Sequence, residues 1–331
     1  MDTYEQQYRG ANVLITGGLG FIGSNLAHRL VACGALVTLV DSLIPHYGGN
    51  LRNIAGIEDQ VTVNIADVRD EHSMNYLVQG RDYLFNLAGQ TAHLDSMLDP
   101  YADLDINCRA QLSILEASRK QNPAIRIVYA STRQIYGKPD YLPVDERHLL
   151  RPTDVNGINK MAGEWYHILY NNVYDIRACA LRFTNTIGPR MRVKDARQTF
   201  LGIWIRRLLD GEPIQVFGDG MQIRDFNYVD DAVDALLMAG AADGANGQIF
   251  NLGSDETINL RDLAALLIDI HGSGECEIVP FPPERKAIDI GDYYADYRLI
   301  RGRLGWYPQV SLREGLRRTL EFYRAERAHY W

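Results

Sequence analysis

Short β-branched apolar runs alternate with longer segments of helical periodicity through the first half of the chain. Apolar runs of this length predict strands, and the segments between them predict helices. The predicted strands are Ala11–Thr16, Ala35–Val40, Val61–Ile65, Tyr83–Leu87, Ile125–Ala130 and Ile176–Phe183. Six strands in this alternation predict an α/β fold with a doubly wound parallel sheet, covered by helices on both faces.

The alternation stops after the sixth strand. Beyond it, loops rich in Gly and Arg, such as Gly211–Asp225 and Gly272–Asp296, separate single strands and helices. We therefore expect a sheet domain over residues 1–184 and a smaller α/β lobe over residues 185–331. No linker divides the two parts, so strands and helices are free to cross between them. No long sequence period recurs, which excludes repeat architectures.

Composition and charge narrow the functional classes. The 331 residues are 46% hydrophobic and 23% charged, with a net charge of −8, and no stretch concentrates Lys and Arg. Nucleic acid is a poor candidate partner, because binding a phosphate backbone requires a concentrated basic surface. The chain shows neither an apolar run of about 18 residues nor the layout of a secretion signal. We expect a soluble cytoplasmic protein with no membrane partner.

The cysteines do not predict a disulfide or metal framework. Cys33, Cys108, Cys179 and Cys276 lie far apart in the sequence and form no CxxC or Cys/His pair. Such spacing does not suit a zinc site or a disulfide scaffold. We expect each thiol to be a small buried apolar side chain, and we expect no bound metal.

A glycine-rich turn follows the first predicted strand. Gly17, Gly20 and Gly23 stand at GxxGxxG spacing before an amphipathic run. One glycine permits a tight turn, another lets the backbone approach a pyrophosphate, and the third lets the helix pack closely on the sheet. Asp41 ends the second strand, where a carboxylate accepts hydrogen bonds from both ribose hydroxyls and repels a 2′-phosphate. The pattern predicts a Rossmann-type dinucleotide site that prefers NAD to NADP.

These motifs form part of a pattern that runs from Val13 to about Pro308. The sequence resembles the extended short-chain dehydrogenase/reductases of the nucleotide-sugar epimerase/dehydratase type. The matching segments are Thr16–Gly23, Ala66–Arg69, Asn86–Gln90, Asp105–Asn107, Tyr129–Gly137, Leu181–Arg190, Arg224–Asp230 and Arg285–Asp296. The resemblance implies a bound NAD and a reaction that oxidises and then re-reduces one carbon of a nucleoside diphosphate sugar.

The resemblance also implies which residues hold the cofactor. Asp67 and Val68 would hold the adenine, residues 87–89 would line the adenosine and pyrophosphate end, and Asn107 would shape the nicotinamide side. The implied cofactor-binding set is Gly17, Gly20, Phe21, Ile22, Gly23, Asp41, Asp67, Val68, Leu87, Ala88, Gly89, Asn107, Ser131 and Lys160.

In this family a Ser or Thr, a Tyr and a Lys carry out the redox step. The sugar hydroxyl must lose a proton while its carbon loses a hydride, so a base of lowered pKa must lie beside that hydroxyl. A Lys ammonium next to a Tyr lowers the pKa of the phenol by stabilising the phenolate. Thr132 and Lys160 match two of the three catalytic positions, but Asn156 stands where the Tyr belongs.

Asn156 is the main departure from the family pattern. No Tyr in the chain has a Lys four positions later, so no shift of register restores the pair. An amide has no proton that ionises near neutral pH, and the usual mechanism therefore cannot run through this position. Asn159 also departs from the small hydroxyl residue common before the Lys. Two departures within five residues favour natural divergence over a single inactivating substitution.

Arg133 and Gln134 follow Thr132, at the place where the family's sugar 4,6-dehydratases carry an acidic pair. That pair abstracts a proton and expels water, and neither an Arg nor a Gln can replace it. Dehydration of that kind is therefore disfavoured. The Arg133 cation either faces solvent or recognises a carboxylated sugar, such as a uronic acid, through bidentate pairing.

Other polar residues are candidates near the sugar, namely Gln90, His93, Asp95, Ser96, Tyr136 and Arg192. A His can transfer protons near neutral pH, but for His93 the sequence favours the role of a structural loop histidine. Tyr136 matches a position that the family fills with Tyr for packing, which makes it a weak substitute base.

The nucleotide end of the substrate has its own candidate residues. Asn185 matches the family residue that meets the substrate's diphosphate, and Arg224 and Arg285 match two arginines that bind it. Planar guanidinium groups pair bidentately with phosphate oxygens, although each Arg taken alone also suits a structural ion pair. The expected substrate-binding set is Gln90, Arg133, Asn185, Arg192, Phe217, Arg224 and Arg285.

Two segments, about Tyr101–Lys120 and Gly157–Tyr170, match the helices of the family's dimer interface. In the second segment an apolar stripe recurs at helical spacing. Its members are Ile158, Met161, Trp165 and Ile168. Such a stripe suits either a homodimer interface or the core of one chain, and we expect a homodimer.

The sequence supports three functional hypotheses. The first is an NAD-dependent epimerase that acts on a nucleoside diphosphate sugar of the UDP-glucose or UDP-glucuronate type through a transient keto-sugar. The second is a decarboxylase or an atypical dehydratase that starts from the same keto-sugar. The third is a catalytically impaired protein that binds NAD or a nucleotide sugar.

Overall fold

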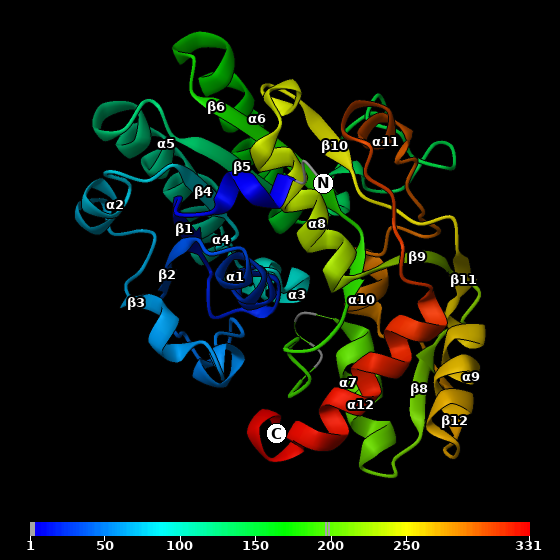
Figure 1. The fold of residues 1–331 in the computed structure, drawn as a ribbon. Helices are drawn as coiled ribbons and strands as arrows, with labels where there is room; N and C mark the ends of the chain where they lie inside the picture. Colours follow the sequence, from blue (N-terminus) through cyan, green and yellow to red (C-terminus); the bar gives the residue numbers. More distant parts are fainter. Residues whose placement is uncertain (1–3, 196, 198) are drawn as a thin grey trace.

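A seven-stranded parallel sheet organises the computed structural model, which describes residues 4–195, 197 and 199–331 (Figure 1). Its strands are β1 (Asn12–Thr16), β2 (Leu36–Asp41), β3 (Val61–Ile65), β4 (Tyr83–Asn86), β5 (Arg126–Thr132), β6 (Arg177–Phe183) and β10 (Ile249–Asn251). They lie in the order β10-β6-β5-β4-β1-β2-β3, and every neighbouring pair is parallel. The predicted fold class is confirmed, and the six predicted strands differ from the observed ones by at most two residues at either end.

Helices cover both faces of this sheet because alternate residues of each strand point to opposite faces. On one face lie α1 (Phe21–Ala32) and α8 (Val229–Ala241), and on the other lie α2 (Glu71–Leu77), α5 (Ala110–Gln121) and α6 (Val155–Tyr174). In β1, Val13 and Ile15 belong to the core that includes α1 and α8, whereas Leu14 belongs to the core that includes α2 and α5. Burial on both faces explains why these strands are almost entirely apolar.

A chain of short helices connects β4 to α5. It consists of α3 (His93–Leu98), α4 (Pro100–Leu104) and a single π-helical turn, η4 (Asp105–Arg109), which continues into α5. Both α3 and α4 contact α6. This packing brings the polar residues of the connection against the first turns of α6.

The smaller lobe contains the remaining strands and helices. They are β7 (Asn185–Ile187), α7 (Phe200–Leu209), β8 (Ile214–Phe217), β9 (Ile223–Tyr228), β11 (Thr257–Asn259), α9 (Leu260–His271), β12 (Cys276–Val279), α10 (Pro283–Ala287), α11 (Arg298–Leu304) and α12 (Leu312–Tyr330). Its two small sheets have the strand orders β11-β9-β7 and β12-β8. Of the four thiols, only that of Cys179 is buried: Cys33 and Cys108 are partly exposed, and Cys276 is exposed on β12. The expectation that every thiol is buried is therefore wrong.

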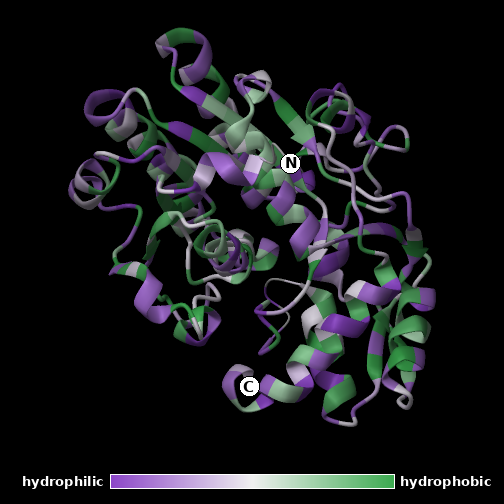
Figure 2. Cartoon of the chain, viewed as in Figure 1, coloured by the Kyte–Doolittle hydropathy of each residue, from purple (hydrophilic) through white to green (hydrophobic). Residues whose placement is uncertain are grey.

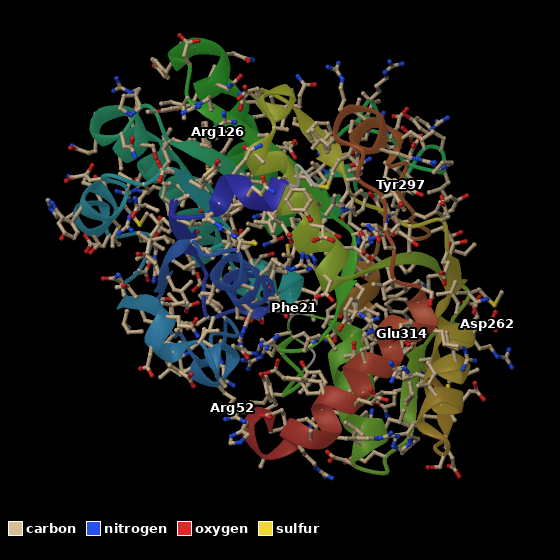
Figure 3. All side chains as sticks on the ribbon, viewed as in Figure 1. Phe21, Arg52, Arg126, Asp262, Tyr297 and Glu314 are labelled. Carbon is tan, nitrogen blue, oxygen red and sulfur yellow. The ribbon has the colours of Figure 1, made fainter. Side chains whose placement is uncertain are left out.

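Chain segments cross between the two parts. Strand β10 pairs with β6, and α8 packs against α1 and β5, although both elements follow residue 184. At the C-terminus, Glu326 of α12 receives two hydrogen bonds from Arg52, at 2.8 and 3.0 Å. Figure 3 labels Arg52 beside the last turns of α12. The lobes are therefore joined at several places.

The seventh strand is absent from the sequence prediction because it is only three residues long. Its pairing with β6, and not a hydrophobic pattern of its own, makes Ile249–Asn251 a strand. Figure 2 shows hydrophobic colours along the strands of the large sheet, whereas α12 carries alternating hydrophilic and hydrophobic bands. None of the helices in the described part of the chain is long and apolar enough to span a membrane.

Candidate functional site

A cavity of about 750 Å³ lies at the carboxyl ends of the large sheet's strands and extends into the smaller lobe. Its walls include Gly17 after β1, Asp41 at the end of β2, Leu87 after β4 and Thr132 at the end of β5. Phe217 and Arg285 of the smaller lobe line the other end. Ligands of doubly wound sheets bind in this position, outside the carboxyl ends of the strands.

The glycine-rich turn packs closely against the neighbouring backbone because its glycines lack a Cβ. Gly17 has φ +66°, and a Cβ there would lie 3.1 Å from the backbone of Ala88. A Cβ on Gly23 would overlap the carbonyl oxygen of Gly17. Helix α1 starts at Phe21 after Gly20, and no side chain caps its first turn. These backbone N–H groups suit a pyrophosphate, so the turn fits a dinucleotide.

Asp41 lies beside this turn and lines the cavity. Its Oδ2 accepts a hydrogen bond from the N–H of Leu19 at 3.1 Å, and its Oδ1 accepts one from Leu43 at 2.9 Å. Burial raises the pKa of Asp41, and the two backbone hydrogen bonds oppose that rise. A carboxylate has about four acceptor positions, so Asp41 keeps capacity for two ribose hydroxyls.

The other expected cofactor residues also line the cavity, with one exception. Asp67, Val68, Leu87, Ala88, Gly89, Ser131 and Lys160 are all on its wall. The Oγ1 of Thr16 accepts hydrogen bonds from the N–H groups of Leu87 and Ala88, which fixes their backbone beside the turn. Asn107 does not line the cavity. It is completely buried, and its amide donates to Gln90 O and to Asp103.

Asn156 lines the cavity, but its side-chain Nδ2 is committed to a buried clamp. Its Nδ2 donates to the carbonyl oxygen of Gln90 at 2.7 Å and to Oδ2 of Asp103 at 3.0 Å. Asn159 donates to Oδ1 of the same carboxylate at 2.8 Å, and Asn107 donates to Oδ2 at 3.0 Å. Three amides therefore surround one completely buried carboxylate. The two departures from the family pattern, Asn156 and Asn159, serve this one residue.

Lys160 follows one turn later on α6. Its Nζ donates to the carbonyl oxygen of Ala130 at 2.5 Å and lies 4.4 Å from the ring centroid of Tyr129. Burial lowers the pKa of Lys160 to about 8, although the charges of Asp103 and Glu164 act in the opposite direction. Glu164 itself forms a buried ion pair with Arg182 at 2.6 Å. The carbonyl group of Ala130 and the ring of Tyr129 thus hold the Lys160 side chain on the cavity wall.

Thr132 ends β5 and begins a short 3₁₀ turn, η5 (Arg133–Tyr136). Its Oγ1 accepts a hydrogen bond from the N–H of Gln134 at 3.2 Å, which leaves its own O–H available as a donor. Tyr136, in contrast, does not line the cavity. It is completely buried, donates to Asn251 at 2.7 Å and accepts a hydrogen bond from Arg182, so it serves the core.

Arg133 lines the cavity and does not turn outward to solvent. Its Nη2 donates to Oδ1 of Asn185 at 3.0 Å, and its guanidinium lies 5.1 Å from the ring centroid of Tyr293. Its Nη1 is buried and has no hydrogen-bond partner among the residues that the structure describes. Burial lowers the pKa of Arg133. A buried, partly unpaired guanidinium suits an anionic or polar ligand group.

Arg224 and Arg285 approach the cavity from the smaller lobe. Arg224 is 3.5 Å from Asp289, and its pKa is lowered to about 10 by burial and by the charge of Arg133. Arg285 lies 5.8 Å from the ring centroid of Phe217. Because the charge of Arg133 disfavours the charged form of Arg224, an anion bound between these two guanidinium groups would be stabilised.

Arg192 differs from the expectation. It does not line the cavity, because its guanidinium is bound to Asp195 and donates to the carbonyl oxygen of Pro45 at 2.9 Å. Asp103 and Asp154, in contrast, were not singled out from the sequence, yet both hold residues beside Thr132 and Lys160. No pattern marked them, since their importance depends on partners 20 to 61 positions away, namely Gln134, Asn156, Asn159 and His93. The cavity also includes Gln222 and Arg207, which no motif predicted.

Comparisons with known proteins agree with this geometry. A profile of the NAD dependent epimerase/dehydratase family matches residues 13–253. The UDP-glucose 4-epimerase of Mycolicibacterium smegmatis is 33% identical over 94% of this chain and 98% of that protein. The UDP-N-acetyl-alpha-D-glucosaminuronate decarboxylase of Bacillus cytotoxicus is 30% identical over 94% and 97%. The solved structure of UDP-glucose 4-epimerase from Thermotoga maritima with UDP-glucose is similar with a TM-score of 0.87, at 31% identity over 95% and 99%.

The buried clamp predicts a large stability loss when its carboxylate is removed. Asp103→Ala leaves three amide donors unpaired and takes a negative charge away from the Lys160 side chain. We expect the free energy of unfolding, measured by urea denaturation, to fall by about 3–5 kcal/mol. The matched control is Asp105→Ala, where a side chain exposed to 45% should change stability by less than about 0.5 kcal/mol. Equal effects of the two substitutions would contradict the clamp.

Proposed function

Because the chain belongs to the NAD dependent epimerase/dehydratase family, we propose that it is an epimerase of nucleoside diphosphate sugars that works through a transient keto-sugar. The expected substrates are UDP-sugars of the glucose or glucuronate type. One observation carries the proposal: a single cavity joins the glycine-rich turn to Arg133, Arg224 and Arg285. A dinucleotide and a second diphosphate can be held in that cavity with their reacting ends towards Thr132 and Lys160.

Each end of the cavity has a distinct task. The family's cofactor, when bound, supplies a nicotinamide that takes up and returns a hydride. Gly17, Gly20 and Asp41 would hold it from the large sheet. Arg224 and Arg285 would hold the diphosphate of the sugar nucleotide, because planar guanidinium groups pair with phosphate oxygens at fixed geometry. The sugar is then confined between the two lobes, which excludes water from the keto-sugar.

The sugar end supplies hydrogen bonds and charge. The Thr132 hydroxyl is positioned to donate to a sugar oxygen, and the Lys160 ammonium favours negative charge developing nearby. Asn156 orients the Gln90 backbone and Asp103 but transfers no proton. If the keto-sugar turns so that its opposite face meets the hydride donor before the hydride returns, the product is the epimer.

A second candidate is decarboxylation of a uronate. The buried Nη1 of Arg133, without a partner in the described part of the chain, favours a carboxylated sugar. A 4-keto uronate is a β-keto acid and loses carbon dioxide once the ketone has formed. The relative from Bacillus cytotoxicus carries the name of such a decarboxylase. In contrast, Gln134 donates to Asp154 and cannot supply the acid of a 4,6-dehydratase.

Product analysis tests these alternatives. The NAD-loaded protein is incubated with UDP-glucose and UDP-glucuronate, and the products are separated and weighed by mass spectrometry. An isomer of unchanged mass supports the epimerase, and loss of carbon dioxide supports the decarboxylase. Tight binding of both ligands without any product overturns both and leaves a binding protein.

The diphosphate assignment predicts a loss of affinity. Arg224→Ala and Arg285→Ala should each weaken UDP binding by about 30- to 1000-fold, since a charged hydrogen-bond partner is lost from a partly buried phosphate. Calorimetry with UDP measures the effect. Arg303→Ala is the matched control, because Arg303 is exposed on α11 and does not line the cavity. Parental UDP affinity in both cavity variants would contradict the substrate class.

Asp41 predicts the choice of cofactor. The protein should bind NAD more tightly than NADP, because the carboxylate repels a 2′-phosphate. Asp41→Asn removes the charge and keeps an acceptor for one of the two backbone N–H groups that Asp41 now receives. We expect the ratio of NAD affinity to NADP affinity to be smaller in this variant than in the parent, as measured by calorimetry with both cofactors. Equal affinity of the parent for NAD and NADP would show that Asp41 does not select the cofactor.

We also propose a homodimer. The predicted apolar stripe on α6 is partly exposed and partly buried in the structure. Ile158 and Trp165 are each 51% exposed, whereas Ile168 is buried. The exposed pair lies on α6, next to α4, where Tyr101 is 78% exposed. Exposed large apolar side chains on neighbouring helices are typical of an interaction surface.

Light scattering at micromolar concentration tests the dimer. The parent should have twice the mass of one chain, and Trp165→Glu should be monomeric because a charge on this apolar surface would be buried unpaired. Tyr307→Glu, at an apolar residue 51% exposed outside the large sheet's helices, is the control and should stay dimeric. A monomeric parent would contradict the dimer.

A further inference from the structure

Proton transfer at the sugar needs an ionisable group that the family pattern does not supply here. Asn156 cannot act as a base, and Lys160 is held by Ala130 and Tyr129. The charged or titratable residues on the cavity wall around α3 and η5 include Arg133, Asp95, Arg197 and His93. Arg133 stays protonated. Asp95 receives a hydrogen bond from Arg197 at 3.1 Å. Of these side-chain types, only an imidazole commonly both accepts and donates protons in catalysis.

His93 is placed by the same clamp that immobilises Asn156. It is the first residue of α3, and its carbonyl oxygen accepts a hydrogen bond from Ser96 Oγ at 2.7 Å. The same Ser96 hydroxyl accepts the N–H of Asn156 at 3.2 Å. One residue earlier, Ala92 O accepts from Gln90 at 2.9 Å, and Gln90 O accepts from Asn156. The backbone of His93 is therefore fixed against α6, with its ring on the cavity wall.

A buried carboxylate lies behind the ring. His93 Nδ1 is 2.9 Å from Oδ2 of Asp154, whose side chain is completely buried. Asp154 caps α6 by accepting the N–H of Gly157 at 2.6 Å, and it receives the amide of Gln134 at 2.9 Å. A carboxylate held on this side of an imidazole orients the ring and leaves Nε2 as the atom for proton exchange.

The Nδ1–H is close to Asp154 but not in line with it. A rotation of the half-exposed ring brings the two into line, and catalytic hydrogen bonds commonly tighten only in the complex with substrate. The carboxylate cannot follow the ring, because its other hydrogen bonds tie it to α6 and to η5.

The departures from the family pattern agree with this arrangement. Gln134, where the family's sugar 4,6-dehydratases carry an acidic residue, donates an amide hydrogen to Asp154 instead of repelling it. Asn156 and Asn159, in place of the Tyr and the small hydroxyl residue, donate to Asp103. All three changes thus supply neutral donors to buried carboxylates, and one of these carboxylates faces His93.

We propose that His93, oriented by Asp154, is the catalytic base and acid of this protein. The assignment rests on the proposed function. In the oxidation, the O–H bond of the sugar breaks and its proton goes to His93 Nε2. The adjacent C–H electron pair leaves with its hydrogen as hydride to the oxidised nicotinamide of NAD, and a C=O bond forms. In the reduction, hydride returns to that carbon and His93 gives its proton back to the oxygen.

The test compares His93→Gln with the parent in two assays. Calorimetry measures the affinities for NAD and for UDP-glucose or UDP-glucuronate, whichever the parent converts, and stopped-flow absorbance measures sugar-dependent reduction of the bound nicotinamide. We expect unchanged affinities and a rate that falls about 10²- to 10⁴-fold, the usual effect of losing a general base. His72→Gln, at an exposed position on α2, is the matched control and should keep the parental rate.

Chemical rescue separates proton transfer from a structural role. Imidazole in the buffer should restore part of the rate to His93→Ala and none to Lys160→Ala, since only the first variant lacks an imidazole.

Three outcomes decide against one or the other proposal. A His93→Gln protein that binds both ligands and keeps the parental rate overturns the assignment of His93 and leaves the proposed function standing. Loss of ligand affinity together with the rate makes His93 a binding residue and also overturns the assignment. A parent that binds NAD and UDP-sugars but reduces no nicotinamide and forms no product overturns the proposed function itself.

Discussion

The sugar end of the site depends on one buried carboxylate. Asp103 is completely buried on α4, and a charge in that position is tolerated only when it is fully hydrogen-bonded. Amides from Asn107, Asn156 and Asn159 supply the donors, and the nearby Lys160 supplies opposite charge. Satisfying this carboxylate brings α4 and α6 together. The position of everything attached to them, including α3, follows from that requirement.

The departures from the family pattern at Asn156 and Asn159 belong to one hydrogen-bonded arrangement around Asp103. A phenol at position 156 would be a proton carrier, whereas the amide found there is a structural donor to the Gln90 backbone and Asp103. Proton chemistry and structural support are therefore separated in this chain. Lys160 keeps its place and charge, but the neighbour whose pKa it would lower is gone. A relocated base and a rigid clamp are two consequences of the same substitution.

Charge at the other end of the cavity is arranged for an anion. Arg133 and Arg224 lie close enough for Arg133 to lower the pKa of Arg224, and Asp289 compensates only in part. Burying like charges together costs free energy, which a bound diphosphate or carboxylate recovers. The net charge of −8 thus says little about the ligand, because Arg133, Arg224 and Arg285 share one cavity wall in an otherwise acidic protein.

The sequence by itself determined the parallel sheet, the glycine-rich turn and the absence of the usual base. These are local properties: strand periodicity, Gly spacing and the identity of residue 156 can each be read within one segment. Two other features could not be read within one segment: the three-residue strand β10, and the division of the apolar stripe on α6 into exposed and buried residues. Both depend on what packs against them. Tertiary structure alone decided that Asn156 turns towards Asp103 and that Asp154 lies behind His93. A side chain's hydrogen-bond partner is set by distances in space, and 61 positions of sequence separate His93 from its carboxylate.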